Sequence, residues 1–338
     1  MSKALVTGAS GFVGGGLVRR LRVAEREVRA LSRSAMPELE AAGAEVVRAD
    51  VADAAAVARA CAGGVETVFH VAAKVGIWGR AADFERTNIE GTRCVVEACR
   101  KAGVPRLVFT SSPSVVFNDS DLAGVDESLP RGTAFPAHYP RTKAIAEEIA
   151  LAANEPGRLA VTALRPHLVW GVGDKNLLPR VIARARAGRL RIVGDGRNKV
   201  DLAHIDNVID AHLLAEAALA RPDSPAAGRA YFITNGEPVV LWDWINDVLL
   251  RLGLPEVKRR IDLATARRLG AVCELVWRGL RLRGEPPMTR FLASELAKDH
   301  WFDITAARRD LGYEPRVSMT VGTVALIPWL RETLRIPA

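Results

Sequence analysis

Short apolar segments alternate with segments of helical spacing through the first half of the chain. Apolar runs that suit buried strands occur at residues 3–7, 27–32, 44–48, 66–71, 106–111 and 159–164. Between them, apolar positions recur at helical spacing over residues 53–61, 83–101 and 139–153. This alternation predicts an α/β fold in which helices cover both faces of a parallel, doubly wound sheet.

The pattern changes near residue 170. From there on helical segments predominate, at 176–187, 206–220, 241–252, 262–282 and 318–334. Turn-rich pieces such as Gly194-Asp195-Gly196 separate them. We therefore expect a sheet domain over residues 1–170 and a smaller, mostly helical lobe over residues 171–338, interleaved with the first and covering a substrate.

A glycine-rich turn joins the first predicted strand to the helix that follows it. Gly8, Gly11 and Gly14 have the spacing GxxGxxG, one residue longer than the GxGxxG of many dinucleotide-binding folds, and Ser10 lies inside the turn. A strand that continues as a helix leaves unpaired N–H groups and a positive dipole end at one point, which suits a pyrophosphate. A purely structural turn is the alternative. Because the glycine-rich turn directly follows a buried strand, we expect a Rossmann-type domain that binds a dinucleotide.

The second predicted strand leads into Arg33, which has Ser32 and Ser34 on either side. A carboxylate at this place would favour NAD by binding the ribose 2′-hydroxyl, whereas an arginine matches the 2′-phosphate of NADP. The sequence therefore predicts NADP(H), with a solvated surface arginine as the alternative. Asp50 and Val51 follow the third strand and are placed to meet the adenine, unless Asp50 is only a strand-end carboxylate.

Tyr139 and Lys143 are one turn apart at the start of a predicted helix, because Pro140 fits only the first turn. A phenol is a poor proton shuttle at neutral pH, and a lysine ammonium about 4 Å away is expected to lower its pKa. Such a pair suits acid–base catalysis. Ser112, or Ser111 if the strand register differs, is expected to hold a substrate oxygen beside the tyrosine hydroxyl.

The glycine turn, the Ser112 strand end and Tyr139-x-x-x-Lys143 together resemble an extended short-chain dehydrogenase/reductase, and more narrowly its 3β-hydroxysteroid dehydrogenase-like branch. Within that branch the chain is similar to bacterial reductases of 2-alkyl-3-oxoalkanoic acids in long-chain olefin biosynthesis. The narrower likeness is carried by residues 70–79, 110–115, 164–166, 193–201, 235–238 and 284–291. The resemblance implies that the protein reduces a 3-keto group with NADPH, using Ser112, Tyr139 and Lys143.

The resemblance also implies further contacts and an assembly. Lys143 is expected to hold the nicotinamide ribose as well as to act with Tyr139. Other residues expected to line the cofactor are Phe12, Val13, Ala72, Lys74 and Pro166. A homodimer is implied, with the helices at 83–103 and 139–154 packed across a two-fold axis.

Several aromatic side chains follow predicted strand ends or turns, where ligands bind in such sheets. Trp78, Phe135, His138 and Trp170 are the residues concerned. They predict an apolar pocket for a hydrophobic small-molecule substrate, with Trp78 and Trp170 as contacts. Packing of these side chains inside the protein is the alternative.

The net charge of +8 is concentrated in residues 258–284, where eight basic and two acidic residues stand among leucines and valines. A solvated arginine-rich helix face is one interpretation. The other is a surface for anionic lipid or for an acidic partner, such as an enzyme of the same pathway. No nucleic-acid binding module accompanies the charge, so nucleic acid is not an expected partner.

The remaining sequence features concern location and metals. No run of about 18 apolar residues is present, and the first strand begins by residue 3, which leaves no room for a signal peptide. The four cysteines and six histidines show no metal-ligand spacing, so no metal site is expected. We expect a cytoplasmic protein, with peripheral membrane contact through residues 258–284 left open.

Three other function classes fit parts of the pattern. A 3β-hydroxysteroid or sterol dehydrogenase would share all of the motifs. A nucleotide-sugar epimerase or dehydratase would share the fold but keep NAD bound, which Arg33 disfavours. A cofactor-sensing regulator without catalysis would not need Ser112, Tyr139 and Lys143 together.

Overall fold

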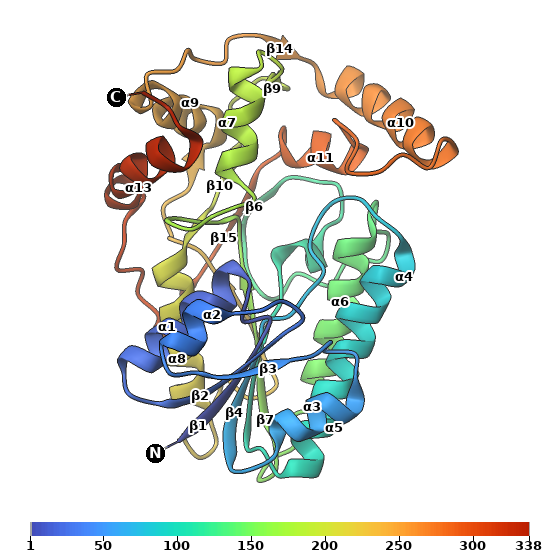
Figure 1. Cartoon of the computed structure of the whole chain (residues 1–338). Helices are drawn as coiled ribbons and strands as arrows, with labels where there is room; N and C mark the ends of the chain where they lie inside the picture. Colours follow the sequence, from blue (N-terminus) through green and yellow to red (C-terminus); the bar gives the residue numbers. More distant parts are fainter. Residues whose placement is uncertain (1, 338) are drawn as a thin grey trace.

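Seven parallel strands form the central sheet of the computed structural model, which describes residues 2–337 (Figure 1). Their order is β12-β7-β5-β4-β1-β2-β3, so the predicted parallel, doubly wound sheet is confirmed, with its switch point between β1 and β4. The strand bounds are β1 Lys3–Thr7, β2 Glu27–Ser32, β3 Glu45–Arg48, β4 Val65–His70, β5 Arg106–Thr110, β7 Ala160–Pro166 and β12 Ala230–Ile233.

Helices cover both faces of this sheet (Figure 1). On one face α1 (Phe12–Val23) packs on α8 (Ile205–Leu219), with α2 (Pro37–Ala41) beside α1. On the other face α5 (Gly91–Ala102) packs between α3 (Ala54–Cys61) and α6 (His138–Leu151). Two layers of buried aliphatic side chains, one on each side of the sheet, hold the helices in place because their burial removes apolar surface from water.

The helix predicted at 83–101 contains one π-helical turn. The chain is α-helical over α4 (Ala81–Phe84), π-helical over Glu85–Glu90, and α-helical again over α5 (Gly91–Ala102). Within the π turn, the Asn88 side chain accepts the N–H of Lys74 at 2.7 Å and donates to the hydroxyl of Thr142 at 2.9 Å. The turn therefore places Asn88 where it joins the loop after β4 to α6, as such turns often do near functional sites.

Two elements from the second half of the chain belong to the sheet domain. Helix α8 covers one face, and β12 pairs with β7 as the seventh strand. Helix α12 (Thr305–Leu311) also packs on α8. The sequence pattern does not predict β12, because four residues between turns carry little periodicity of their own.

The other elements of the second half form a mostly helical lobe at the top of Figure 1. Its helices are α7 Leu178–Arg186, α9 Leu241–Arg251, α10 Leu263–Gly279, α11 Arg290–Glu295 and α13 Met319–Leu334. Its core is a separate cluster that includes Trp170, Trp242 and Leu326. Within residues 2–337, none of the helices combines the length and the apolar character needed to cross a membrane.

Short strands connect the lobe to the sheet domain. A four-stranded sheet has the order β13-β10-β15-β6, with the bounds β6 Leu122–Val125, β10 Lys199–Val200, β13 Val239–Val240 and β15 His300–Phe302. Two further pairs are β8 Val169–Trp170 with β11 Ala203–His204, and β9 Ile192–Val193 with β14 Arg260–Ile261. Most of these strands are two or three residues long, below what sequence periodicity can reveal.

Candidate active site

The glycine turn between β1 and α1 is tightly packed. Gly8 has a φ of +69°, and a side-chain carbon there would lie 2.7 Å from the Cα of Ala72. A side-chain carbon at Gly14 would lie 2.4 Å from the carbonyl oxygen of Gly8. Both positions therefore need glycine. Gly11 is the N-cap of α1, so the unpaired N–H groups of the first helical turn lie beside the turn.

A cavity of about 420 Å³ lies over this turn, at the carboxyl ends of the strands. Most of the predicted cofactor residues line it: Gly8, Ser10, Gly11, Phe12, Val13, Gly14, Arg33, Asp50, Val51, Ala72, Tyr139, Lys143 and Pro166. Lys74 does not, because its ammonium lies 5.3 Å from the centre of the Phe84 ring. An anion-binding turn, an arginine and a proton donor along one cavity fit a nicotinamide dinucleotide.

Arg33 and Asp50 lie on the wall of this cavity where the adenosine end is expected. The hydroxyls of Ser10 and Ser32 are 2.6 Å apart and tie the end of β2 to the glycine turn, while Arg33 is exposed. Burial raises the pKa of Asp50, but hydrogen bonds from a backbone N–H and from Arg86 outweigh it and hold the pKa below its ordinary value. Asp50 is therefore ionised at neutral pH.

Tyr139 lines the cavity and lies beside Ser112, which is not itself one of the lining residues. Tyr139 is half-buried in the first turn of α6, and Ser112 caps the short 3₁₀ turn Pro113–Val116 after β5. Burial raises the pKa of Tyr139, and a hydrogen bond with Ser112 opposes the rise. The hydroxyl of Ser111 instead donates to Glu147 at 2.6 Å. Ser111 lines the cavity, but its hydroxyl is taken by Glu147, whereas Ser112 is the serine hydrogen-bonded to Tyr139.

The expectation that Lys143 lowers the pKa of Tyr139 is wrong in this structure. The buried ammonium of Lys143 donates to the carbonyl oxygen of Thr110 at 2.6 Å and lies 4.2 Å from the centre of the Phe109 ring. Burial lowers the pKa of Lys143 itself to about 7, against the opposing charge of Glu147. The prediction from spacing took Lys143 as a charged ammonium beside the phenol, whereas desolvation here acts on both groups and disfavours the charged form of each.

A buried ion pair positions α6. Glu147, one turn beyond Lys143, accepts hydrogen bonds from Arg165 of β7 at 2.8 and 2.7 Å. Burial raises the pKa of Glu147, but Arg165 outweighs it, so the carboxyl stays ionised. Together with Ser111, the pair joins α6 to β5 and β7 and so fixes Tyr139 and Lys143. The sequence gives no sign of it, because Glu147 looks like any surface glutamate of a helix.

A second buried network of hydrogen bonds supports the glycine turn. The pattern of the sequence does not reveal it. The ring nitrogens of His70 lie 2.8 Å from the hydroxyl of Thr7 and 3.0 Å from that of Thr92. The Thr7 hydroxyl also accepts the N–H of Ala72 at 3.2 Å. Burial lowers the pKa of His70 to about 3, so the ring is neutral and holds β1 against the loop after β4.

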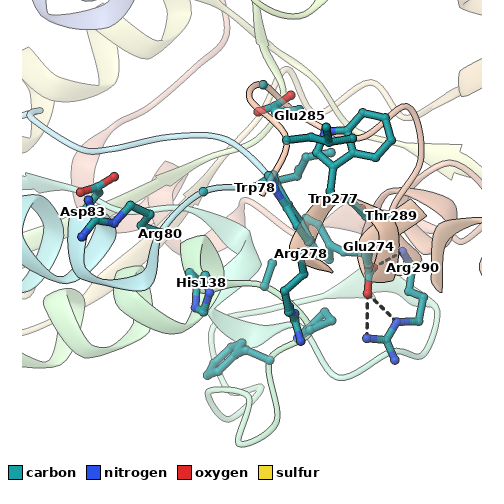
Figure 2. Close-up of a pocket in the computed structure, with 18 of the residues that line it drawn as sticks. Trp78, Arg80, Asp83, His138, Glu274, Trp277, Arg278, Glu285, Thr289 and Arg290 are labelled. Atoms are coloured by element: carbon teal, nitrogen blue, oxygen red, sulfur yellow. Dashed lines mark hydrogen bonds and ion pairs between the residues drawn. The ribbon is translucent and has the colours of Figure 1, made fainter. Parts of the chain in front are cut away.

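A larger cavity, of about 880 Å³, lies beside the start of α6 (Figure 2). Trp78, Phe135 and His138 line it, together with α10 and the segment that follows. The prediction that Trp170 contacts the substrate is wrong, because this residue lines neither cavity. It is wholly buried in the core of the lobe, with its ring centre 5.1 Å from that of His204 and 5.4 Å from that of Trp244.

Five arginines line this larger cavity, and two of them are neutralised. Arg141 pairs with Glu85, and Arg290 is held by Glu274 at 2.8 Å (Figure 2). The three that form no ion pair with any residue of the described range 2–337 are Arg80, Arg278 and Arg281. Burial lowers the pKa of His138, and the charges of Arg141 and Arg278 lower it further. The cavity thus combines aromatic walls with a positive field.

The fold and the site define an extended short-chain dehydrogenase/reductase. The features concerned are the seven-stranded Rossmann sheet, its glycine turn, and Ser112, Tyr139 and Lys143. Residues 5–264 match the 3-beta hydroxysteroid dehydrogenase/isomerase family, and the chain belongs to this family. It is therefore an oxidoreductase that uses a nicotinamide cofactor. This confirms the class of enzyme predicted from the sequence.

Similar proteins agree with this assignment. The chain is 50% identical over 323 residues to a 2-alkyl-3-oxoalkanoate reductase of Stenotrophomonas maltophilia (strain K279a), across 95% of this chain and 97% of that protein. It is 41% identical over 328 residues to a protein of the same name from Shewanella oneidensis, across 95% and 84%. The solved structure of MoeE5 in complex with UDP-glucose and NAD matches with a TM-score of 0.76 at 27% identity, across 98% of this chain and 100% of that one.

Proposed function

We propose that the protein is an NADPH-dependent reductase that converts a long-chain 2-alkyl-3-oxoalkanoic acid into the 2-alkyl-3-hydroxyalkanoic acid in olefin biosynthesis. The observation that carries this proposal is the 880 Å³ cavity lined by His138 and Arg141 at the start of α6, which combines aromatic walls with arginines that lack an ion pair. A substrate with two alkyl chains and a carboxylate needs both. The names of the two relatives above support the same substrate class.

The residues around Tyr139 suit reduction of a ketone. A dinucleotide held at its pyrophosphate by the glycine turn would supply the hydride for the keto carbon from its reduced nicotinamide. The hydroxyl of Tyr139 gives its proton to the keto oxygen, and Ser112 binds the same oxygen, so carbon and oxygen each gain one hydrogen. Because the pKa of Lys143 is about 7, this lysine can exchange protons near neutral pH and help to reprotonate Tyr139.

Arg33 is expected to make NADPH preferred over NADH by about 10–150-fold, since a charge-assisted contact contributes roughly 1.5–3 kcal/mol. Arg33→Ala should remove most of this preference and leave the affinity for NADH little changed. Titration of both cofactors measures it. Arg158→Ala is the matched control, because Arg158 is an exposed arginine that pairs with Glu155 and lines neither of the two cavities nor the hollow between α5 and α6. Equal affinities for the two cofactors in the wild type would contradict the assignment to NADPH.

Arg278 is the proposed receptor for the substrate carboxylate, since it lines the cavity close enough to His138 to affect that residue's pKa. Arg278→Ala should raise the KM for the oxo acid by about 10–150-fold and leave the KM for the ketone without the carboxylate nearly unchanged. Arg283→Ala is the matched control, an exposed arginine of the same segment outside the cavity. An equal loss with both substrates would place the carboxylate elsewhere.

A 3β-hydroxysteroid dehydrogenase is the second candidate, because the matching family carries that name and the aromatic walls suit a sterol. A sterol has no carboxylate for the cavity's arginines. NADPH oxidation with a 2-alkyl-3-oxoalkanoate, its ketone analogue and a 3-ketosteroid separates the two functions. Turnover of the steroid alone would move the assignment to the steroid branch.

We also propose a homodimer built from α5 and α6, as the family resemblance implies. The surface between these helices has a hollow of about 270 Å³, whose lining includes Val96, Ile149 and Ala153. Two copies related by a two-fold axis would place the same hollow opposite itself.

A further inference from the structure

Helix α10 is anchored along one side only. Its Ala266, Gly270 and Cys273 are buried, and α10 packs closely against α11. A side-chain carbon at Gly270 would lie 2.6 Å from the backbone carbon of Thr289, so the two segments touch through their backbones. Figure 1 shows α10 in orange at the upper right edge of the lobe, with its other side away from the sheet domain.

The other side of α10 and the residues after it are unusually apolar for a surface. Six of the twelve exposed large apolar side chains of residues 2–337 lie in this one segment: Leu269, Val272, Leu275, Val276, Leu280 and Leu282. Leu275 is 71% exposed and Leu280 is 69% exposed. Positions 269, 272, 276 and 280 share one helix face. Concentrated exposure of this kind marks an interaction surface, whereas scattered single residues would not.

Most basic residues of the segment that carries this apolar stripe have no ion-pair partner. Within the segment 258–284, Lys258 pairs with Glu256 and Arg267 pairs with Asp119. The other six basic residues form no ion pair with any residue of the described chain: Arg259, Arg260, Arg268, Arg278, Arg281 and Arg283. Of the two acids in the segment, Asp262 caps α10 and Glu274 is taken by Arg290, so the positive charge is not cancelled locally.

We propose that α10 binds the surface of an anionic lipid bilayer, with the apolar stripe among the acyl chains and the unpaired arginines that lie outside the cavity, Arg259, Arg260, Arg268 and Arg283, at the headgroups. A surface for this segment must offer apolar contacts for the stripe and negative charge for the arginines together. An anionic bilayer satisfies both. The helix would lie in the interface, because it is too short and too charged to span the membrane.

This orientation would bring the substrate cavity to the membrane. Trp277, Arg278 and Leu282 come from the same segment and line the 880 Å³ cavity, so α10 has one side toward the cavity and another toward solvent. If the proposed function holds, a substrate with two long alkyl chains partitions into lipid and can enter the cavity from there. The lipid contact itself does not depend on the substrate.

The test is sedimentation of the full chain with vesicles of phosphatidylcholine, alone or with about one-third phosphatidylglycerol. At about 0.1 M salt, at least about tenfold more protein should bind the anionic vesicles, and about 1 M salt should release it. The double variant Val272→Asp with Leu275→Asp should lose at least about tenfold in binding. Val321→Asp with Val324→Asp is the matched control, two exposed valines three residues apart on α13, and should bind like the wild type.

Three results would overturn the proposal: equal binding to both vesicle types, wild-type binding by the α10 variant, or loss of self-association by that variant in light scattering without vesicles. The last result would mean that a second copy covers the stripe. The α10 variant should retain wild-type turnover of a short-chain, water-soluble oxo acid. Absence of turnover in the wild type would instead count against the proposed function and leave the lipid result standing.

Discussion

Replacing Tyr139 with phenylalanine is expected to lower kcat by about 10²–10⁴-fold, the range for loss of a general acid, with cofactor affinity close to that of the wild type. The ring keeps its half-buried place at the start of α6, and only the hydroxyl is lost. Burial holds the pKa of Tyr139 above its ordinary value, so the hydroxyl carries its proton at neutral pH and can donate it.

Tyr313→Phe is the matched control for this change. The Tyr313 hydroxyl donates to the carbonyl oxygen of Thr234 at 2.8 Å and lines neither cavity, so turnover per folded molecule should not change. Steady-state kinetics and a cofactor titration on both variants measure the difference. A Tyr139→Phe protein with nearly wild-type kcat would show that another group donates the proton.

Replacing Glu147 with alanine is expected to lower the free energy of unfolding by about 3–5 kcal/mol, because it leaves the Arg165 charge buried without its partner. The side chain of Glu147 is 0% exposed and that of Arg165 is 5% exposed, so water cannot replace the lost carboxylate. Urea unfolding measures the change. Since the pair also positions α6, the folded variant should have reduced turnover.

Glu148→Ala is the control from the next position on α6. Its side chain is 70% exposed and pairs with Arg131 at 3.2 Å, so its loss should cost only about 0–1 kcal/mol. If Glu147→Ala does not fold, Glu147→Gln keeps an acceptor oxygen for Arg165 and should show a smaller loss. Equal unfolding midpoints for Glu147→Ala and Glu148→Ala would contradict a structural role for the buried pair.

The local pattern of the sequence predicted six of the seven strands of the central sheet, the main helices and the glycine turn, because each depends on neighbouring residues. Gly8 and Gly14 follow from the sharp strand-to-helix turn alone. Tyr139 and Lys143 could be placed on one helix from their spacing and from Pro140. These features need no knowledge of which distant segments meet.

Features that depend on distant contacts could not be predicted in this way. The pairing of Glu147 with Arg165 requires knowing that β7 lies under α6, and the π turn at Asn88 requires the loop after β4. Trp170 looks like a pocket residue from its place at a strand end, but β8 pairs with β11 and buries it in the lobe. The pKa of Lys143 depends on burial that the whole fold creates.

Deuterium labelling tests whether the protein transfers hydride to the 3-keto carbon of a 2-alkyl-3-oxoalkanoic acid. The wild-type protein is incubated with NADPH deuterated at C4, in each of its two stereochemical forms, and with the freshly prepared oxo acid. One of the two forms, and only one, should yield 2-alkyl-3-hydroxyalkanoic acid with a single deuterium at C3 in mass spectrometry. Unlabelled or absent hydroxy acid with both forms would contradict such a transfer.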